Sequence, residues 1–503
     1  MLNPIQEAAA AMRQGRADTA LGIILRKLHQ TPSAQALNIF RRACRQLGLA
    51  TFAANYLSLL KKNHPGNAQL ADELAHSYWQ CGDAERALHE TQSGLAVHPA
   101  HPGLNLLLAK MKKNQGDSKT ACAILLAMCG TERAAPNNLR EFARLLCELG
   151  IDDHAAPIWR TLVNRNQQPY IDLIGLALCE TRLGNIEEGA RIAEEASRHS
   201  DGQARHLPLL SLIATAAPPE IARRMHGLRL ALFAAAPIPK ISKILSDAQE
   251  RLLAIRTEPA GAALVRDQTA KASFICPIHR PRDVENAVSQ IQHQDWQNAE
   301  AIFAVNSHAI PDEAIARLWR SRLPLTILDC RSLGTLGAVL NRATKEASGD
   351  FVFKFDADDR YYPRYGSDMI LQAEHFDADL VEKPGKFRYI DESQALVLEN
   401  FDDIYAPSRG GFSAGGATLC IRRHVFDSIG FNEQTRSSSD VLFHGSCAGA
   451  GMKVQLADPF NYLSIRSADL VQHTWRLDAV LLASSRDTAL IGGMDAADRH
   501  VVV

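Results

Sequence analysis

The stretch FVFKFDADDR, residues 351–360, alternates apolar and other side chains and then ends in carboxylates. Its first half is typical of a β-strand, and Asp356, Asp358 and Asp359 follow at the strand's tip. Carboxylates this close together repel one another at neutral pH, and a divalent cation bound through hard oxygen ligands relieves that repulsion. Alone, the stretch also fits a solvated acidic turn in which Asp359 caps a helix.

Similar apolar runs surround this stretch, and segments with helical spacing separate most of them. The predicted strands cover residues 272–279, 299–305, 323–329, 350–356 and 378–384. Residues 283–294, 311–321 and 335–347 carry apolar side chains three and four positions apart, as amphipathic helices do. This alternation favours a mostly parallel sheet covered by helices, with ligands beyond the carboxyl ends of its strands. The acids are therefore expected to line a crevice.

The first half of the chain carries glycines at a constant spacing of 34 residues: Gly48, Gly82, Gly116, Gly150 and Gly184. Small residues stand five positions after these glycines and after Gly15: Ala20, Ala53, Ala87, Ala121, Ala155 and Gly189. Prolines stand 17 positions after Gly15, Gly48 and Gly82: Pro32, Pro65 and Pro99. Such a period predicts stacked helix hairpins, each ended by a proline.

This spacing resembles the tetratricopeptide repeat, most completely in QCGDAERALHETQSGLAVHPAHP, residues 80–102. The resemblance spans about residues 3–200 and implies a curved solenoid whose concave face binds a peptide or a partner protein. A role as a spacer or an oligomerisation arm is the alternative. Residues 201–268 are expected to form a helical cap and linker.

Four segments of the second half resemble the family 2 glycosyltransferases of the GT-A fold: residues 273–279, 293–306, 333–359 and 415–433. The resemblance covers about residues 272–476. It implies a Rossmann-like α/β domain over residues 269–480, followed by a tail over residues 481–503. It also implies a nucleotide-sugar donor, with a UDP-sugar favoured, and Mn²⁺ or Mg²⁺ as the cofactor.

The resemblance implies these donor-binding residues: Pro277, His279, Arg280, Asn306, Asp329, Asn341, Asp356, Gly415 and Gly416. In the family, the first strand ends in a proline-containing loop beside the nucleotide, which His279 matches. Asn306 stands where the family usually places an aspartate that contacts the base. Gly415 and Gly416 would let the backbone approach the donor closely, although structural turns require glycine equally often.

Asp356, Asp358 and His473 are the metal ligands that the resemblance implies. Asp440 is the implied catalytic base, which would take the proton from the acceptor hydroxyl. The family usually has an acid directly before this residue, and Ser439 replaces it here. Asp440 also suits the N-terminus of a helix, and that structural role is compatible with catalysis.

Composition excludes several other classes of function. The 503 residues include 55 basic and 56 acidic side chains, so the net charge of -1 gives no field that would attract nucleic acid. The start of the chain has no apolar core that could serve as a signal peptide, and the longest apolar runs fall well short of the roughly 20 residues of a transmembrane helix, so a cytoplasmic protein is expected. The ten cysteines include no CxxC pair, so neither a zinc site nor a disulfide framework is predicted.

The sequence thus predicts a multidomain protein: an all-α solenoid at residues 1–200, then the α/β domain. Its expected activity is metal-dependent, inverting transfer of a sugar to a hydroxyl of a protein or surface polysaccharide. The repeats would bind the acceptor or a partner protein. Two alternatives are a catalytically degenerate scaffold, whose repeats mediate protein interactions, and a nucleotidyltransferase. PIHRPRD, residues 277–283, lacks the glycine-rich phosphate loop of the latter class.

Overall fold

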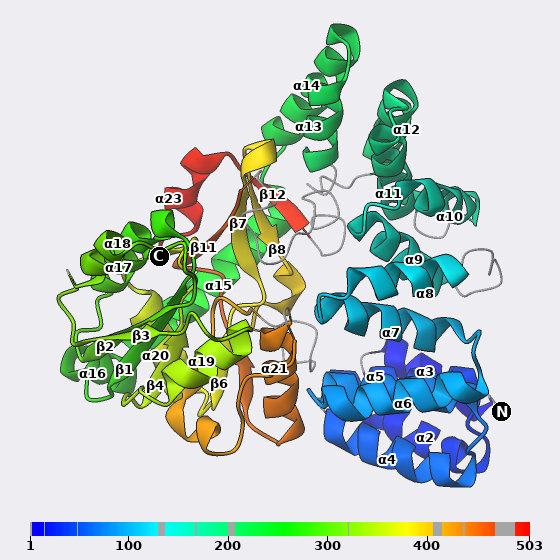
Figure 1. The fold of residues 1–503 in the computed structure, drawn as a ribbon, viewed down its shortest axis with the longest axis horizontal. Coiled ribbons are helices and arrows are strands. Elements are labelled where there is room, and N and C mark those ends of the chain that lie inside the picture. Colours follow the sequence, from blue (N-terminus) through cyan, green and yellow to red (C-terminus); the bar gives the residue numbers. More distant parts are fainter. Residues whose placement is uncertain are drawn as a thin grey trace.

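An all-α array and an α/β domain lie side by side in the computed structural model (Figure 1). The structure describes residues 3–14, 16–47, 49–128, 136–165, 169–199, 207–319, 321–405, 415–435, 438–467 and 488–503. This architecture confirms the predicted fold class. Of the helices in these ranges, none combines the length and apolar character needed to cross a membrane.

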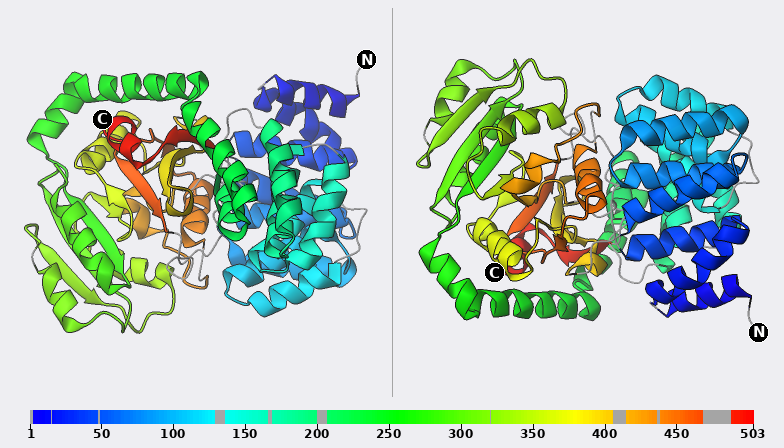
Figure 2. Two further views of the ribbon diagram at one scale, coloured as in Figure 1. Left: turned by 90° about the horizontal axis from the view of Figure 1, so that it is seen from above. Right: turned by 90° about the horizontal axis from the view of Figure 1, so that it is seen from below.

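The array consists of helix pairs that follow one another along the chain and stack beside the α/β domain (Figure 2). The helices are α1 (Pro4–Arg13), α2 (Ala17–Gln30), α3 (Ala34–Gln46), α4 (Ala50–Asn63), α5 (Ala68–Gln80), α6 (Ala84–Val97), α7 (Pro102–Asn114), α8 (Ser118–Met128), α9 (Pro136–Glu148), α10 (Asp152–Arg165), α11 (Pro169–Arg182) and α12 (Ile186–Arg198).

The repeated glycines lie in the turns within the helix pairs, where the backbone adopts a left-handed conformation. The φ angles of Gly82, Gly116, Gly150 and Gly184 are 77°, 83°, 74° and 86°. Glycine adopts this conformation without the steric penalty that a Cβ atom brings. The small residues five positions later are buried where helices cross, as in Ala87, which has no exposed surface. Gly15 and Gly48 lie outside the described residues.

Four helices join the array to the α/β domain: α13 (Leu207–Ala216), α14 (Pro219–Ala234), α15 (Pro239–Thr257) and α16 (Pro259–Asp267). The long helix α15 runs along the α/β domain (Figure 2). Its Leu245 and Leu252 are buried in one apolar cluster with Phe387 and Leu398 of that domain. The region predicted as a cap and linker therefore packs extensively on the domain that follows it.

A seven-stranded sheet forms the centre of the α/β domain, in the order β10-β6-β9-β4-β1-β2-β3. Its strands are β1 (Ala272–Ile278), β2 (Ala299–Val305), β3 (Leu325–Asp329), β4 (Phe351–Lys354), β6 (Leu380–Glu382), β9 (Cys420–Arg422) and β10 (Val454–Leu456). All of its neighbouring pairs are parallel except the two that involve β9. The prediction of a mostly parallel sheet is confirmed.

The strands are connected by the helices α17 (Val284–Gln292), α18 (Asp312–Leu318), α19 (Leu336–Thr344), α20 (Tyr365–His375) and α21 (Ser439–Gly449), and α23 (Ala497–His500) follows the last strand. Short 3₁₀ turns complete it: η2 (Pro281–Asp283), η3 (Asp391–Ser393), η4 (Phe401–Asp403), η5 (Arg423–Asp427) and η7 (Met494–Ala496). Each of the five predicted strands and three predicted helices has its counterpart within a few residues of the expected bounds.

A second sheet, with the order β12-β8-β7-β11-β5, packs beside the first and was not predicted. Its strands are β5 (Arg360–Tyr361), β7 (Lys386–Ile390), β8 (Ala395–Glu399), β11 (Tyr462–Arg466) and β12 (Thr488–Gly492). Strand β12 lies within residues 481–503, which the sequence assigned to a tail, and it pairs with β8. The end of the chain is therefore built into the α/β domain.

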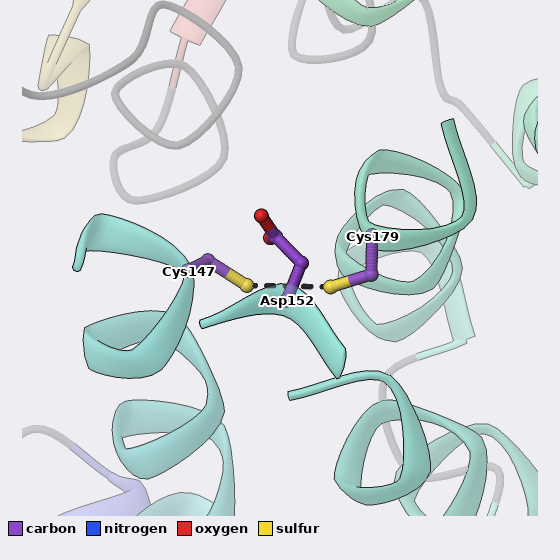
Figure 3. A group of neighbouring side chains, drawn as sticks. All are labelled: Cys147, Asp152 and Cys179. Atoms are coloured by element: carbon purple, nitrogen blue, oxygen red, sulfur yellow. Dashed lines mark hydrogen bonds between the residues drawn. The ribbon is translucent and has the colours of Figure 1, made fainter. Parts of the chain in front are cut away.

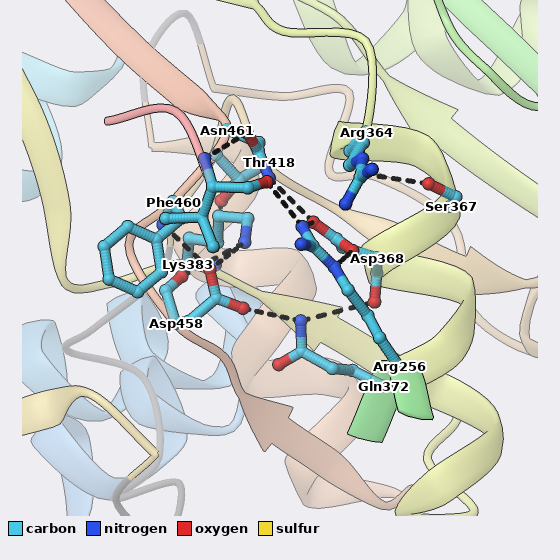
Figure 4. Close-up of polar contacts among 11 residues, drawn as sticks. Arg256, Arg364, Ser367, Asp368, Gln372, Lys383, Thr418, Asp458, Phe460 and Asn461 are labelled. Carbon is cyan, nitrogen blue, oxygen red and sulfur yellow. Dashed lines mark hydrogen bonds and ion pairs between the residues drawn. The ribbon is translucent and has the colours of Figure 1, made fainter. Parts of the chain in front are cut away.

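Buried ion pairs join to each other two loops that run from the first sheet to the second, and helix α15 to helix α20 (Figure 4). Lys383 Nζ lies 3.0 Å from Asp458 Oδ1, and neither side chain has any exposed surface. Arg256 of α15 donates two hydrogen bonds of 2.8 Å to the carboxylate of Asp368 in α20. Buried charges are tolerated only when they are paired in this way.

Removal of one partner tests how strongly the domain depends on this network. Asp458→Ala leaves the ammonium of Lys383 buried without its carboxylate, so we expect the free energy of unfolding to fall by about 3–5 kcal/mol. The control Lys453→Ala breaks the exposed pair with Asp377 and should cost less than about 1 kcal/mol. Urea unfolding, monitored by the fluorescence of the tryptophans, which include the buried Trp296 of this domain, measures both values, and equal effects would contradict the expectation.

Candidate active site

The carboxyl ends of β1, β2, β3 and β4 meet at one edge of the first sheet because these strands run parallel. His279 follows β1, Asn306 follows β2, Asp329 ends β3 and Asp356 follows β4. Four sequence-predicted residues thus lie along the same edge. Pro277, which was predicted in the loop, lies within β1 opposite Ala304 of β2.

Pro277 fits inside β1 because one side of the strand is already unpaired there. Pairing of β1 with β4 ends at Ile275, so only β2 continues beside Pro277. Proline lacks a backbone N–H and is tolerated where a strand has no neighbour to receive that hydrogen bond. The strand therefore extends to Ile278, and the loop starts at His279.

Two acids of the motif are each paired with a cation of the chain itself. Lys354 Nζ forms an ion pair with Asp356 Oδ1, and Arg280 donates a 3.2 Å hydrogen bond to Asp358 Oδ2. Burial raises the pKa of Asp356, and Lys354 opposes that rise. Burial also lowers the pKa of His279, with a further contribution from the charge of Arg280.

Asp359, the third acid, points away from the other two and into the protein. Tyr462 Oη donates to Asp359 Oδ2, and the backbone N–H of Ile465 donates to Oδ1 over 2.9 Å. Burial, followed by the charges of Asp358 and Asp356, raises the pKa of Asp359 to about 7. Asp359 therefore anchors the motif to β11, and the side chains of Asp356 and Asp358 remain partly exposed.

Helix α17 fixes the backbone of the motif, which the sequence did not predict. Asn286 Nδ2 donates to the carbonyl oxygens of Ala357 and Asp359, over 2.6 and 2.9 Å. Gln290 Nε2 donates to the carbonyl of Asp356 over 3.1 Å. Asn286 and Gln290 are four positions apart and so share one helix face, which was the only sequence signal for this role.

The side chain of Asp440 packs directly against the backbone of Gly416. A Cβ atom on Gly416 would lie 1.7 Å from Asp440 Oδ2 and 2.8 Å from Asp440 Cβ. The backbone of Gly416 therefore has no room for a side chain. Gly415 is enclosed as well, because its Cβ would lie 2.6 Å from the carbonyl oxygen of Lys383.

Tyr361 joins the acidic motif to this glycine turn. Its hydroxyl accepts a 2.9 Å hydrogen bond from the backbone N–H of Asp356 and donates to the carbonyl oxygen of Ala417. The charge of Asp440 also acts on both Asp356 and Lys354. The start of α21 therefore lies near the tip of β4.

Asn306 contributes a buried acceptor to the edge. Its Oδ1 is shielded from solvent and has no hydrogen-bond partner among the described residues. An unsatisfied buried acceptor carries a desolvation cost that a ligand N–H would remove. Asp329 differs, because its side chain is exposed and its Oδ1 accepts from the backbone N–H of Arg331 over 3.1 Å.

Asn341 holds the loop before α21. Its Nδ2 donates to the carbonyl of Phe431 and to Glu433 Oε1, and its Oδ1 accepts from the N–H of Phe431 over 2.8 Å. These contacts leave its amide engaged with protein groups, so the structure gives it a structural role on this loop. His473 lies outside the described residues.

Among the described residues, one group of three side chains of the kinds that bind metal ions lies close together, and this group is in the helical array (Figure 3). Cys147 Sγ and Cys179 Sγ are 3.4 Å apart, and Asp152 lies beside them. Arg182 donates a 3.2 Å hydrogen bond to Asp152, and the guanidinium thus neutralises the carboxylate. Trp159 also covers Cys147, so these side chains serve as part of the packing between α9 and α11.

No protein-family model matches the sequence, and no curated protein matches it either. Solved structures that resemble parts of the chain include S. aureus TarS, with 20% identity, a TM-score of 0.32, and coverage of 39% of this chain and 37% of that chain. TTC0263, a tetratricopeptide repeat protein of Thermus thermophilus, matches with 23% identity and a TM-score of 0.29 over 36% of this chain and 97% of that chain.

A third similar structure is the mannosyltransferase PcManGT of Pyrobaculum calidifontis in complex with GDP-Man and Mn²⁺. It has 14% identity, a TM-score of 0.30, and coverage of 52% of this chain and 68% of that chain. All three TM-scores lie below 0.5, so these similarities carry no conclusion about the activity of this chain.

The contact between Gly416 and Asp440 generates a direct prediction. Gly416→Ala forces the turn or the start of α21 to move, and we expect the free energy of unfolding to fall by about 1–3 kcal/mol. Gly227→Ala is the matched control, since a Cβ there meets nothing within 4 Å and α14 should gain about 0.5–1 kcal/mol. Urea unfolding of the two variants measures both changes in the free energy of unfolding. An unchanged stability of Gly416→Ala would show that Asp440 is not held against this glycine.

Proposed function

We propose that the protein is a metal-dependent, inverting glycosyltransferase that moves a sugar from a nucleotide-sugar donor to an acceptor hydroxyl. One observation carries this proposal: Asp356 and Asp358 at the tip of β4 share a site with Asp440 at the start of α21. The bridging hydroxyl of Tyr361 and the close approach of Gly416 to Asp440 hold these groups together. Such a site combines a place for a leaving diphosphate with a base.

The donor would bind along the sheet edge, with its base near β2 and its diphosphate near β1. The buried Oδ1 of Asn306 would accept a hydrogen bond from an N–H of the base. Uracil offers such an N–H, as guanine also does, so this contact is compatible with the UDP-sugar that the resemblance favours. Arg280 would turn from Asp358 to the diphosphate, because a guanidinium matches phosphate oxygens well.

Asp356 and Asp358 fit a divalent cation, since each has a partly exposed carboxylate with a second oxygen beyond the one paired with Lys354 or Arg280. Mg²⁺ and Mn²⁺ are commonly held by one or two carboxylates together with substrate phosphates. His473 is proposed as a further ligand. When bound, the cation would neutralise the charge that develops on the departing nucleoside diphosphate.

Asp440 would act as the general base. It would accept the proton of the acceptor hydroxyl while the acceptor oxygen attacks the anomeric carbon. The bond from that carbon to the diphosphate oxygen breaks on the opposite side, so the configuration inverts. Burial disfavours the charged form of Lys354, but the carboxylate of Asp356 outweighs this effect and raises the pKa of Lys354. Lys354 therefore keeps its proton, and its positive charge offsets the negative charges of Asp356 and Asp440.

The acceptor is proposed to be a protein or a surface polysaccharide, with the helical array binding the acceptor or a protein that delivers it. Solenoids of stacked helix pairs present an extended concave surface suited to such binding. The array and the proposed active site lie on adjoining parts of the molecule, because α21 packs against the array (Figure 1).

A catalytically degenerate scaffold is the second candidate, and one observation favours it. Lys354 and Arg280 already pair with Asp356 and Asp358, so the motif is charge-compensated without a metal. In that case, the array would provide the activity of the protein through its interactions. Donor turnover distinguishes the two candidates.

The test is the release of nucleoside diphosphate from a panel of nucleotide sugars, with Mn²⁺, Mg²⁺ or a chelator. We expect wild type to hydrolyse one donor slowly in the presence of metal. Asp358→Ala should lose at least about a hundredfold in rate through loss of charge stabilisation. Asp440→Asn should lose about a hundredfold or more while its affinity for the donor is retained.

The control is Asp247→Ala, which removes an exposed acid of α15 far from the crevice and should stay within about twofold of wild type. Turnover that persists in chelator, or in Asp358→Ala, would contradict metal-dependent transfer. A wild type that neither binds nor turns over any donor would instead support the scaffold.

A further inference from the structure

Helix α21 lies between the two parts of the protein (Figure 1). On one side, Phe443 stacks on Phe431 with ring centroids 4.2 Å apart, inside the apolar cluster of the first sheet. On the other side, α21 packs against α4 and α5 of the helical array. The helix that begins with Ser439 and Asp440 therefore packs in the core of the α/β domain and also contacts the array.

The backbone of α21 and the backbone of the turn between α5 and α6 approach each other closely. A Cβ atom on Gly82, in the turn between α5 and α6, would lie 2.4 Å from the carbonyl oxygen of Leu442 and 2.1 Å from Ser446 Oγ. A Cβ on Gly445 of α21 would lie 2.3 Å from the carbonyl oxygen of Gln80. Neither glycine has room for a side chain between the two segments, so a shift of either one displaces the other.

Two hydrogen bonds fix the ends of α21 to neighbouring repeats. Asn114 Nδ2, at the end of α7, donates to Ser438 Oγ over 3.2 Å. Thr51 Oγ1, in α4, donates to the carbonyl oxygen of Gly449. Ser438 stands two residues before Asp440, so the array holds the helix at the end where the proposed base lies.

We propose that the helical array is a positioning element of the active site. The turn at Gly82 and the side chain of Asn114 would set the position of α21, and with it the carboxylate of Asp440. This inference rests on the proposed function, because it assigns a role in that reaction to residues of the array. It follows that an acceptor or a partner that bends the array would alter the rate of transfer.

The repeats themselves supply a matched set of variants. Gly82, Gly150 and Gly184 occupy equivalent turns with φ between 74° and 86°. An added Cβ would meet α21 at Gly82, yet it would meet nothing within 4 Å at Gly150 or Gly184. Alanine at each position brings the same backbone strain, and only Gly82→Ala also pushes on α21.

The experiment compares Gly82→Ala with Gly150→Ala in the metal-dependent donor assay. We expect kcat of Gly82→Ala to fall by about tenfold or more with KM for the donor unchanged, since a misplaced base affects the chemical step. Gly150→Ala should retain kcat within about twofold. Asn114→Ala, which removes one hydrogen bond without backbone strain, should lower kcat in the same direction by a smaller factor.

Hydrogen exchange of the peptide covering residues 439–449 gives a readout that needs no activity. Gly82→Ala should accelerate exchange there, and Gly150→Ala should leave it as in wild type. Equal kcat for the two glycine variants, or equal exchange, would overturn the positioning role. A wild type without any turnover would refute the proposed transferase itself, and the exchange data would then still decide whether Gly82 holds α21.

Discussion

The carboxylate of Asp359 is buried between the tip of β4 and the second sheet, where Tyr462 and Ile465 donate hydrogen bonds to it. A carboxyl group in such a place is costly unless its oxygens are satisfied, and β11 provides both donors. This anchor fixes the direction of the motif. The side chains of Asp356 and Asp358 stay partly exposed. Tyr361 ties the backbone of Asp356 to the turn that lies against Asp440. The proposed chemistry depends on that arrangement.

Much of this could be predicted from the sequence because local patterns specify it. Strands β1 to β4 are short apolar runs ending in turns, and the period of Gly82, Gly116 and Gly150 reflects one backbone requirement repeated along the chain. Gly416 was expected beside the donor, and Asp440 as the base, only through the resemblance to a family, and the contact between the two was not predicted. The structure adds the physical reason, since a glycine is needed where a carboxylate touches the backbone.

The remaining features depend on contacts between distant residues, and these leave little trace in local sequence. The second sheet pairs β5, β7, β8, β11 and β12, whose residues are scattered over the last third of the chain. Asn341 was predicted as a donor contact, yet its amide is engaged by Phe431 and Glu433, which lie about 90 residues later. The packing of Gly82 on α21 joins residues even further apart, so no periodicity could reveal it.

The most direct test is to locate the metal. Crystals of the protein grown with Mn²⁺ and UDP, measured at the manganese absorption edge, would show each bound ion as an anomalous peak. The account predicts a peak within coordination distance of the carboxylates of Asp356 and Asp358, with Arg280 moved from Asp358 to the diphosphate. A map with no manganese at the tip of β4, and with Lys354 and Arg280 still paired to the two acids, would contradict it.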